Sequence, residues 1–479
     1  MIDDIEKRKL ISLIAETCEQ LKGLPPSETK EVVACESARN LLKVLGVTPQ
    51  NINSEFRCAN KLKVDLAARF SSLSKSPEFN VKPRDPELLI EVKRSGIDFK
   101  TNKKEYTAVV IQLERYLKAK LCKSVKYGII FNGRQLQLFR KHGMLCYPIS
   151  SVLSLDKTNI ESTIKFLEKE VIEEVDSRGS IITVWNNKGG VGKTTTVQGL
   201  GLLLSMEQGY GKKERYKVLL IDYDHNQGDL TDNFRSKPSD GGTKDLLLTN
   251  IQGLKIKEEK INNYIYKFTE ERGFPKRIYN IDLLPCDSQL SKPGFDYKRE
   301  FSAKLDEFPL RQLCLELAKN YDFIIIDAPP NFEQSDFSKE AVNAADCILP
   351  IALYLEKNSC RNFSEAAIKY LKDSQNKRKD GGPFSLGLWF NRWKGTSAQD
   401  QVTKDYVEDI ISKSNKDDQH ELKRIFYKSL ASSKSFRKIR ECPDISRAIM
   451  EEKYSYLPGV VRFQRAIGTY KDLLSEFTN

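Results

Sequence analysis

The sequence predicts an α/β protein with two domains. In the C-terminal part, apolar runs rich in β-branched residues alternate with segments whose leucines have helical spacing, which is typical of a mostly parallel sheet covered by helices on both faces. In the N-terminal part, two predicted strands are followed by a helix and by a strand, an Asn-Gly turn and a strand at 127–139. The chain has 479 residues, more than one compact core usually supports.

Composition restricts the class of protein. Hydrophobic residues make up 39% and charged residues 30%, as in soluble globular proteins, and no apolar stretch approaches the roughly 20 residues that a bilayer requires. The first residues are acidic and show no secretory signal, so we expect a cytoplasmic protein, with nucleoid association as an option and no membrane partner. The net charge of +12 fits a polyanionic partner such as DNA, but a lysine-rich surface explains it equally well.

Cysteine and histidine usage indicates magnesium rather than zinc. The ten cysteines include no Cys-x-x-Cys pair, which argues against a disulfide scaffold and a zinc ribbon. The three histidines are scattered along the chain and cannot build a histidine-rich site. We therefore expect any metal to be Mg²⁺ or Mn²⁺ held by carboxylates.

Charged residues occupy strand positions in the N-terminal domain. Residues 64–68 and 88–93 have the pattern of strands, and Glu91 and Lys93 project from one face because side chains alternate along a strand. If the two strands pair, Asp65 joins them. Two carboxylates and a lysine on one face can hold Mg²⁺ and activate water against a phosphodiester. A cross-strand salt bridge on a solvated face would explain Glu91 and Lys93 alone.

The order of elements around these residues adds to the pattern. A helical segment at 36–42 precedes the strands, the helical segment 110–117 follows them, and the hairpin at 127–139 comes last. This order resembles the PD-(D/E)XK nuclease superfamily, and it is most similar to the nuclease domain of the R subunits of type I restriction enzymes, over about residues 25–145.

The resemblance implies a restriction-endonuclease-like α/β fold and Mg²⁺-dependent cleavage of DNA. It implies that Asp65, Glu91 and Lys93 are catalytic and that Asp65 and Glu91 hold the metal. Gln112 would lie near the scissile phosphate, and Glu36 would be the acid of the first helix. Because these motifs are short, a catalytically idle relative that only binds DNA is the alternative.

A short polar segment separates the two domains. Residues 176–180 contain serine, arginine and glycine, and they follow a predicted helix at 160–174. We therefore predict domains at 1–175 and 181–479, joined by this linker.

Residues 188–195 have the pattern of a phosphate-binding loop between a strand at 181–185 and a helix. In such a loop the glycine N–H groups wrap the β-phosphate, while Lys193 and Thr194 supply charge and a Mg²⁺ ligand. The phosphates would lie at a helix N-terminus, where backbone dipoles favour anions. A second lysine, Lys188, stands five positions before the usual one. The expected nucleotide-binding residues are Lys188, Gly189, Gly190, Val191, Gly192, Lys193, Thr194 and Thr195.

Two predicted strands of the C-terminal domain end in acidic residues. Asp222 and Asp224 follow one apolar run and Asp327 follows another, at the strand ends where open parallel sheets bind ligands. Asp327 has the form of a Walker B acid that holds Mg²⁺, and Asp222 is a further candidate ligand. An aspartate that caps a turn would explain Asp327 alone. The predicted strands lie at 181–185, 217–221, 281–285, 323–326, 347–351 and 386–390.

The early lysine and the acids together resemble the ParA/MinD family of deviant Walker A ATPases, over essentially residues 180–479. The resemblance implies ATP and Mg²⁺ as cofactors and a homodimer that forms on ATP binding. Lys188 would reach the phosphates bound by the second copy, and hydrolysis would occur only in the dimer.

The same resemblance implies roles for single residues. Lys193 would hold the β- and γ-phosphates, Thr194 the Mg²⁺ and Thr195 the α-phosphate region. Asp224 matches the residue that positions the attacking water, and Asn391 resembles the asparagine that meets the adenine base. The chain departs from the family after Asp224, because His-Asn-Gln-Gly stands where Pro-Gln-Gly is usual. This loop senses the nucleotide state in the family, so the departure leaves the turnover rate open.

The densest basic and aromatic stretch of the C-terminal domain lies at 423–440. Its lysines and arginines would contact DNA phosphates without sequence preference and with strong salt dependence. A solvated helix face explains the stretch equally well. The candidate DNA-binding residues are Lys428, Lys434, Arg437, Lys438 and Arg440.

Two functions follow from these patterns. The first is an ATP-gated nuclease, in which ATP closes a dimer and brings two nuclease modules together on DNA, as prokaryotic defence against phage or plasmids would require. The second is a partition or positioning ATPase whose N-terminal domain binds DNA or a partner without cutting. In that case a second protein could stimulate ATP hydrolysis.

Overall fold

The computed structural model divides the chain into two compact units. The first unit comprises residues 1–177, 378–382 and 479, and the second comprises residues 178–377 and 383–478. The structure describes residues 3–25, 31–70, 79, 83–100, 103–173, 178–209, 213–254, 256–272, 277–301, 308–332, 335–429, 435–442 and 468–478.

The first unit is built on one sheet with the strand order β1-β2-β3-β4-β5-β6, and β7 pairs with β5. Only β3 and β4 run parallel among these pairs. The strands are β1 (Ile52–Ala59), β2 (Leu62–Ala68), β3 (Leu88–Val92), β4 (Tyr127–Phe131), β5 (Gln135–His142), β6 (Leu145–Pro148) and β7 (Leu153–Ser154). The helices are α1 (Asp4–Lys22), α2 (Glu31–Val44), η1 (Pro49–Asn51), α3 (Lys104–Leu117), η2 (Lys120–Cys122), α4 (Ile160–Glu168) and η3 (Lys169–Glu173).

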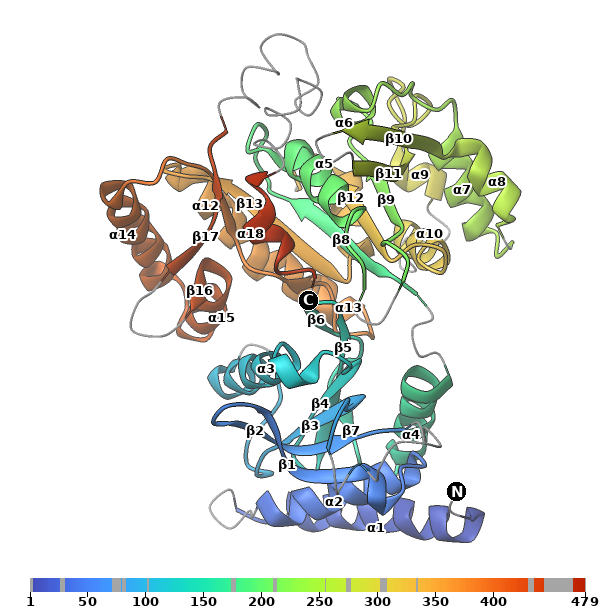
Figure 1. Cartoon of the computed structure of the whole chain (residues 1–479), viewed down its shortest axis with the longest axis vertical. Coiled ribbons are helices and arrows are strands. Elements are labelled where there is room, and N and C mark those ends of the chain that lie inside the picture. Colours follow the sequence, from blue (N-terminus) through green and yellow to red (C-terminus); the bar gives the residue numbers. More distant parts are fainter. Residues whose placement is uncertain are drawn as a thin grey trace. The chain divides into compact units, whose positions relative to one another are not determined.

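Helices cover both faces of this sheet. Every residue of β3 is buried, as expected for a central strand with both faces covered. Figure 1 shows α1 and α2 along one side of the sheet and α3 on the other. Helix α3 packs closely, because a Cβ added at Gly128 of β4 would lie 3.0 Å from the Leu117 side chain. The close approach of α3 fixes where its polar residues lie relative to β2 and β3.

The second unit contains a larger sheet with the strand order β10-β11-β9-β12-β8-β13-β15-β17-β16, and β14 pairs with β13. The pairs from β11 through β17 are parallel, and β10 and β16 add antiparallel edges. The strands are β8 (Ser180–Trp185), β9 (Val218–Asp222), β10 (Tyr266–Arg272), β11 (Arg277–Leu284), β12 (Phe323–Asp327), β13 (Cys347–Leu353), β14 (Phe384–Ser385), β15 (Trp389–Trp393), β16 (Tyr427–Ser429) and β17 (Ser435–Arg440).

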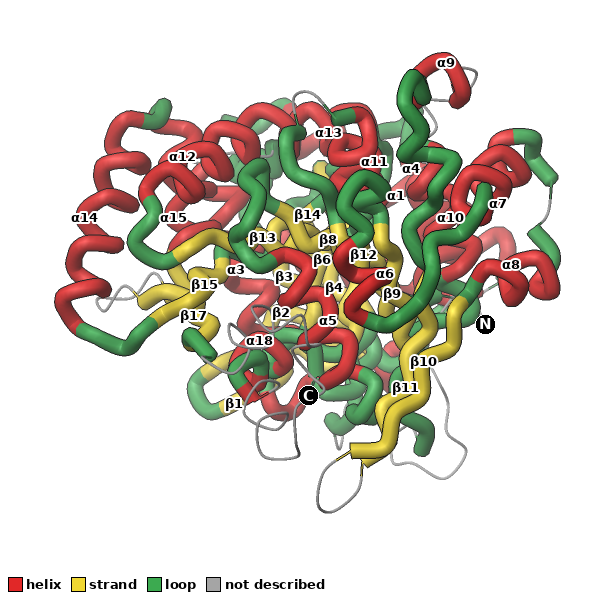
Figure 2. Tube along the Cα trace, turned by 90° about the horizontal axis from the view of Figure 1, so that it is seen from above, coloured by secondary structure: helices red, strands yellow, loops and turns green. Residues whose placement is uncertain are grey.

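Helices lie on both faces of the larger sheet as well. Figure 2 shows α11, α12 and α13 on one side of its strands and α5 and α18 on the other. The prediction of a mostly parallel sheet covered by helices is thus confirmed for this unit. The helices are α5 (Lys193–Leu204), α6 (Asp229–Asn233), α7 (Gly242–Ile251), α8 (Glu258–Tyr264), α9 (Tyr297–Phe301), α10 (Pro309–Leu317), α11 (Asp336–Ala344), α12 (Lys357–Ala366), η5 (Ala367–Leu371), α13 (Lys372–Lys377), α14 (Ser397–Lys413), α15 (Lys416–Phe426) and α18 (Lys471–Leu474).

Several predicted boundaries differ from the structure. Of the predicted strand at 386–390 only residues 389 and 390 lie in a strand, β15, because Gly387 has φ 90° and breaks the extended backbone between β14 and β15. The predicted helix at 160–174 is α-helical only to Glu168 and continues as a π-helical turn. Part of the predicted linker, residues 176 and 177, lies outside the described residues. Within the described part of the chain, no helix is long and apolar enough to cross a membrane.

Candidate functional site

The phosphate-binding loop connects the end of β8 to the start of α5. Gly190 and Gly192 have φ of 73° and 96°, in the left-handed region that glycine adopts at little cost. A Cβ added at Gly189 or Gly190 would have no heavy atom within 4 Å. The loop therefore presents open backbone at the N-terminus of α5, which fits a phosphate group.

Lys193 is buried at the base of this loop. Its Nζ donates to the carbonyl oxygen of Lys188 at 3.3 Å. Burial lowers the pKa of Lys193, while the charges of Asp327 and Asp224 raise it. The ammonium group thus lies inside the loop with acids around it, where it can meet a triphosphate. Thr194 and Thr195 follow it in the first turn of α5.

Asp222 and Asp327 lie side by side at the carboxyl ends of β9 and β12, where they are register partners. Burial raises the pKa of Asp222 to about 6 and that of Asp327 to about 8. One oxygen of Asp222 accepts from the backbone N–H of Thr231 at 2.8 Å and from its hydroxyl at 2.6 Å. The Oδ1 atoms of both acids are buried and have no hydrogen-bond partner among the described residues.

The Oδ1 atoms of Asp222 and Asp327 are suitable ligands for a divalent cation beside Thr194. The Thr194 hydroxyl hydrogen-bonds the Asp327 carboxyl and lowers its pKa against the effect of burial. Two neighbouring buried carboxylates repel each other unless a cation or protons neutralise them. Among the described residues, no group of three or more His, Cys, Asp or Glu side chains is arranged to hold a metal. A cation here would therefore need Thr194, phosphate oxygens or water as further ligands.

The loop after β9 is held by a buried histidine. Asp224 is buried, and its pKa is raised by burial against the opposing charge of Lys193. His225 Nδ1 accepts from the backbone N–H of Asp287 at 3.0 Å, and its ring packs against Tyr223 and Phe337. Burial lowers the pKa of His225 to about 3, so it is neutral at physiological pH. The residue that departs from the family pattern therefore fixes the backbone of this loop.

Asn391 lies in the middle of β15 and touches the phosphate-binding loop directly. Its Nδ2 donates to the carbonyl oxygen of Val191 at 3.0 Å. A Cβ added at Gly192 would lie only 2.2 Å from the same nitrogen. Asn391 thus borders the loop, although the sequence placed it 200 residues away from Val191.

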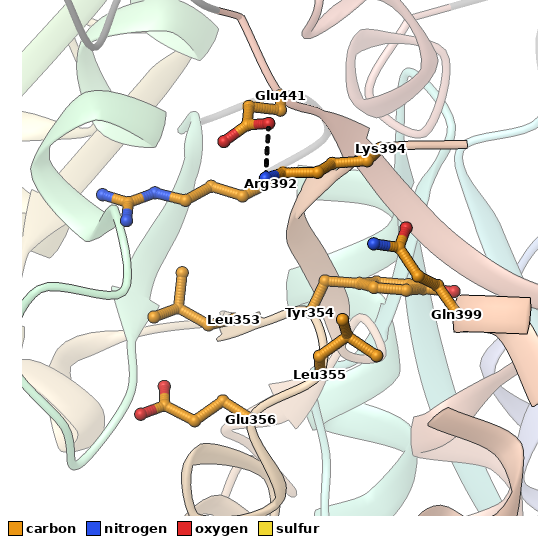
Figure 3. A pocket seen from close by; sticks show the side chains of 8 residues that line it. All are labelled: Leu353, Tyr354, Leu355, Glu356, Arg392, Lys394, Gln399 and Glu441. Atoms are coloured by element: carbon orange, nitrogen blue, oxygen red, sulfur yellow. Dashed lines mark ion pairs between the residues drawn. The ribbon is translucent and has the colours of Figure 1, made fainter. Parts of the chain in front are cut away.

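Lys188 forms an ion pair with Glu356, the residue before α12. Glu356 also lines a pocket of about 290 Å³ together with Tyr354, Arg392 and Glu441. Figure 3 shows the Glu356 and Arg392 side chains extending to the same side of this pocket. The early lysine is therefore directed toward the segment after β13.

The first unit brings Asp65, Glu91 and Lys93 together. Lys93 pairs with Glu91, and Asp65 Oδ2 accepts from the backbone N–H of Val92 at 2.6 Å. Glu91 is 2% exposed, and burial together with the Asp65 charge raises its pKa to about 8. Burial lowers the pKa of Lys93, but its hydrogen bond with Glu91 and the charges of the nearby acids together outweigh burial, so the net shift is upward. The predicted trio is one electrostatic cluster.

Helix α3 places Gln112 at this cluster through Tyr116. Gln112 Nε2 donates to the Tyr116 hydroxyl at 2.7 Å. Tyr116 is buried, and burial raises the pKa of its hydroxyl. The charges of Glu91, Lys93 and Asp65 also act on this pKa, so Tyr116 lies near the cluster. The sequence prediction did not include Tyr116. Its spacing of four residues from Gln112 on a helix was the available signal.

The acid of α2 that acts on Lys93 is Glu31 rather than Glu36. Glu36 is exposed and pairs with Arg39 at 3.1 Å. The charge of Glu31, at the first residue of α2, contributes to the raised pKa of Lys93. A second omission in the predicted set is Asp229 of α6, whose charge acts on Lys193 in the second unit.

The candidate DNA-binding residues that the structure describes lie on strands, not on a helix. Lys428 of β16 pairs with Glu476 at 3.8 Å. On β17, Arg437 donates to the carbonyl oxygens of Ile425 and Tyr427, at 3.3 and 3.2 Å. Its guanidinium group is thus committed to the protein backbone.

The other two described residues of the candidate DNA-binding set, Lys438 and Arg440, both lie over the ring of Trp393. Lys438 pairs with Asp400 at 2.6 Å, and its Nζ lies 4.3 Å from the centre of the Trp393 ring. The Arg440 guanidinium lies 5.4 Å from the same centre. Lys434 lies outside the described residues.

Comparison with known proteins identifies the second unit. Residues 179–378 match the family model of an AAA domain. The sporulation initiation inhibitor protein Soj of Bacillus subtilis is 31% identical over 153 residues, 32% of this chain and 51% of Soj. The chromosome partitioning protein ParA of Myxococcus xanthus is 30% identical over 193 residues, 39% of this chain and 56% of that protein. The second unit thus contains an AAA-type P-loop domain that is similar to that of ParA proteins. The chain spans about half the length of the curated relatives it matches.

Two solved structures are similar in part to this chain. The complex of Cyanothece McdA with ATP has a TM-score of 0.42 and 20% identity, covering 62% of this chain and 97% of McdA. The septum site-determining protein MinD of Pyrococcus horikoshii OT3, complexed with Mg-ADP, has a TM-score of 0.38 and 19% identity, covering 62% of this chain and 96% of MinD.

Proposed function

We propose that the second unit is a Mg²⁺-dependent ATPase, that ATP joins two copies of the chain, and that the dimer acts on DNA as a partition or positioning ATPase. The observation that carries this proposal is the P-loop with its buried Lys193 and the unpartnered oxygens of Asp222 and Asp327. Phosphoryl transfer needs positioning and charge neutralisation more than covalent chemistry, and these groups supply both. A relative named for chromosome partitioning supports the same function.

Each residue has a role in this proposal. The loop N–H groups and Lys193 bind the β- and γ-phosphates, and Thr195 meets the α-phosphate region. Thr194 holds Mg²⁺ with Asp327 and Asp222 close by, and the cation would neutralise charge on the phosphates. Asp224 accepts a hydrogen bond from the attacking water and orients it.

Two further residues complete the nucleotide site. Asn391, which already borders the loop at Val191, contacts the base. Lys188 is delivered to the nucleotide of the second copy, so that hydrolysis depends on assembly.

We expect Lys193→Ala to abolish nucleotide binding, because it removes the buried ammonium group from the phosphate site. Asp224→Ala should retain binding and form a long-lived ATP dimer, because the attacking water loses its acceptor. Equilibrium binding of a fluorescent ATP analogue and size-exclusion chromatography with light scattering measure both effects. A monomeric Asp224→Ala protein at saturating ATP would contradict the role given to Asp224.

DNA contacts of the second unit would use Lys428, Lys438 and Arg440. We leave Arg437 out of this surface, because its guanidinium group is bound to two backbone carbonyls. The net charge of +12 supports a polyanionic partner. Binding of this kind is independent of DNA sequence and falls steeply as salt rises.

A second candidate function is Mg²⁺-dependent cleavage of DNA by the first unit. The observation that favours it is the cluster of Asp65, Glu91 and Lys93 with Gln112 and Tyr116 beside it. Asp65 and Glu91 would hold the cation, which would activate water, and Lys93 would stabilise charge on the phosphate. Cleavage coupled to an ATP-dependent dimer is the form that a defence protein against foreign DNA would take.

Plasmid cleavage by the purified chain tests this second function. With Mg²⁺ and ATP, we expect the wild type to nick or cut the plasmid and Lys93→Ala to lose at least about 100-fold in rate, as for the loss of one charge-stabilising group. Lys63→Ala is the matched control, because Lys63 pairs with Glu55 on an exposed part of the same sheet. Intact plasmid with the wild type would leave the first unit as a binding module.

A further inference from the structure

One histidine ring connects the segments that follow three neighbouring strands, β11, β9 and β12, which are adjacent in the sheet. His225 lies in the loop after β9, and its Nδ1 accepts from the backbone N–H of Asp287, which follows β11. Its ring packs against Phe337 of α11, the helix that follows β12, with the ring centres 5.2 Å apart. The loop that contains Asp224 is therefore attached on both sides through His225.

Asp287 is a fixed partner for this hydrogen bond. It is fully buried, and its carboxylate accepts from the backbone N–H groups of Gly241 and Lys244, both at 2.8 Å. These N–H groups lie at the N-terminus of α7, where they have no partner within the helix. The N–H that meets His225 thus belongs to a residue that is already held by the start of α7.

Asp224 precedes His225 directly and begins a tight turn. Its carbonyl oxygen accepts from the N–H groups of Gln227 at 3.1 Å and Gly228 at 2.9 Å. Among the described residues, the His225 side chain makes the hydrogen bond that connects this turn to the segment after β11. The orientation of the turn, and with it that of the Asp224 carboxylate, therefore depends on the His225 ring.

Proline, which is usual in the family directly after this acid, cannot make the same contact. Its side chain has no nitrogen or oxygen that accepts a hydrogen bond. The buried N–H of Asp287 would then have no acceptor, which is unfavourable. In this chain, a hydrogen bond to a capped helix thus takes the place of the fixed backbone dihedral of proline.

We propose that His225 is a positioning residue for ATP hydrolysis, which holds Asp224 where this acid orients the attacking water. Position matters because a displacement of about 1 Å at a reacting group can lower a rate about 100-fold. His225 contacts no phosphate in this scheme and acts through the backbone of Asp224. The inference rests on the proposed ATPase, and it adds a residue outside the phosphate-binding loop on which the rate depends.

Two variants of about the same shape test the hydrogen bond. His225→Asn keeps an acceptor near the place of Nδ1, whereas His225→Leu has none, and both lose the ring. We expect His225→Leu to lower kcat for ATP about 10-fold to 100-fold, and His225→Asn to stay within about threefold of the wild type. The Kd of a non-hydrolysable ATP analogue should change less than about twofold in both, because the hydrogen bond serves hydrolysis and not binding.

Tyr321→Phe is the control for a purely structural effect. The Tyr321 hydroxyl donates to Asp282 of β11 at 2.7 Å, and Tyr321 precedes β12, at the sheet edge opposite the nucleotide site. Tyr321→Phe and His225→Leu should each lower the melting temperature by about 2–4 °C, as the loss of one hydrogen bond does. Only His225→Leu should lower kcat. Equal kcat values in His225→Leu and His225→Asn, or in His225→Leu and Tyr321→Phe, overturn the positioning role.

A spectroscopic measurement tests the hydrogen bond without hydrolysis. The chain has three histidines, so a ¹⁵N spectrum of histidine-labelled protein shows three side chains, and the signals absent from His225→Asn belong to His225. We expect an unprotonated Nδ1 and a protonated Nε2 at pH 7, because Nδ1 accepts from Asp287. A proton on Nδ1 overturns the inference. If the wild type hydrolyses no ATP, the proposed ATPase fails and the positioning role fails with it, whereas the expected spectrum would still establish the hydrogen bond.

Discussion

At the scale of single residues, buried carboxyl groups control the response to pH. Burial raises the pKa of Glu91, Asp327 and Glu340 to about 8 in each case. A folded chain with a raised carboxyl pKa binds protons more tightly than the unfolded chain does. The contribution of such a carboxyl group to stability is therefore greatest at low pH and, for a glutamate, is lost as the pH rises from about 4.5 to about 8.

Glu340 offers a test of this effect outside both candidate sites. It lies on α11, and its Oε2 is buried with no hydrogen-bond partner in the described part of the chain, so its ionisation inside the core is unfavourable. We expect Glu340→Gln to become more stable relative to the wild type as the pH rises from 5 to 8, by up to about 1.4 kcal/mol per pH unit. Urea unfolding at a series of pH values measures the difference. A difference that does not change with pH would show that Glu340 is not protonated in the folded chain.

Single residues were also the part of the site that the sequence predicted least completely. The pattern of acids and lysines identified Asp65, Glu91 and Lys93 as a group, and the structure places them in one cluster. It did not include Glu31, whose charge acts on Lys93, because its place near the cluster depends on where α2 begins and how the helix is rotated. It also gave Arg437 a surface role, because a sequence shows a charge but not the backbone carbonyls that bind it.

At the scale of elements, the strand ends were predictable and the irregular joints were not. Apolar runs followed by acids predicted that Asp222 and Asp327 end buried strands, and the parallel pairing of β9 and β12 brings them level. The carboxyl ends of parallel strands lie at the same edge of a sheet, so the closeness of Asp222 and Asp327 follows from the sequence pattern. The break at Gly387 did not, because a single glycine with positive φ leaves no periodic signal.

An ion cluster around Asp346 joins three elements of the second unit. Arg178, just before β8, donates to Asp346 at 2.6 and 3.0 Å, and Arg311 of α10 donates at 3.2 Å. Burial raises the pKa of Asp346, but the two arginines outweigh it and hold the pKa well below its usual value. Asp346 directly precedes β13, so its carboxylate links α10 and the start of β8 to the start of β13.

We expect Asp346→Asn to destabilise the second unit by about 3–5 kcal/mol, because it removes the negative charge that Asp346 places beside two largely buried guanidinium groups. Asp373→Asn is the control, since Asp373 pairs with Lys377 on an exposed helix face and should cost less than about 1 kcal/mol. Tryptophan fluorescence during urea unfolding measures both. Equal losses in the two variants would show that the cluster contributes no more than a surface pair.

At the scale of the whole molecule, the chain passes from the second unit to the first and back. The segment Arg378–Gly382 belongs to the first unit, although it lies in sequence between α13 and β14 of the second. The Lys379 carbonyl oxygen accepts from the N–H of Ser151 at 3.1 Å, and Arg378 binds both oxygens of Asp380 at 2.9 and 2.8 Å. A fragment of residues 1–177 would therefore lack the segment Arg378–Gly382, which belongs to the first unit.

Gly381 is the point at which this segment is most tightly constrained. It has φ 74°, and an added Cβ would lie 2.1 Å from the carbonyl oxygen of Ser150. Gly46, in the same unit, has φ 85° and open space around it. We expect Gly46→Ala to cost about 1–2 kcal/mol from left-handed backbone strain alone. Gly381→Ala should cost about 1–3 kcal/mol more, because the methyl group must displace backbone.

The position of the tryptophans allows the two units to be followed separately. All three, Trp185, Trp389 and Trp393, lie in the second unit, so their fluorescence reports on that unit alone. Hydrogen exchange of the β5 amides reports on the first. Gly381→Ala should reduce β5 protection at least about fivefold more than Gly46→Ala does, a ratio that corresponds to about 1 kcal/mol. Equal protection in the two variants would mean that Arg378–Gly382 is not a structural part of the first unit, because only that membership makes the Gly381 contact costly there.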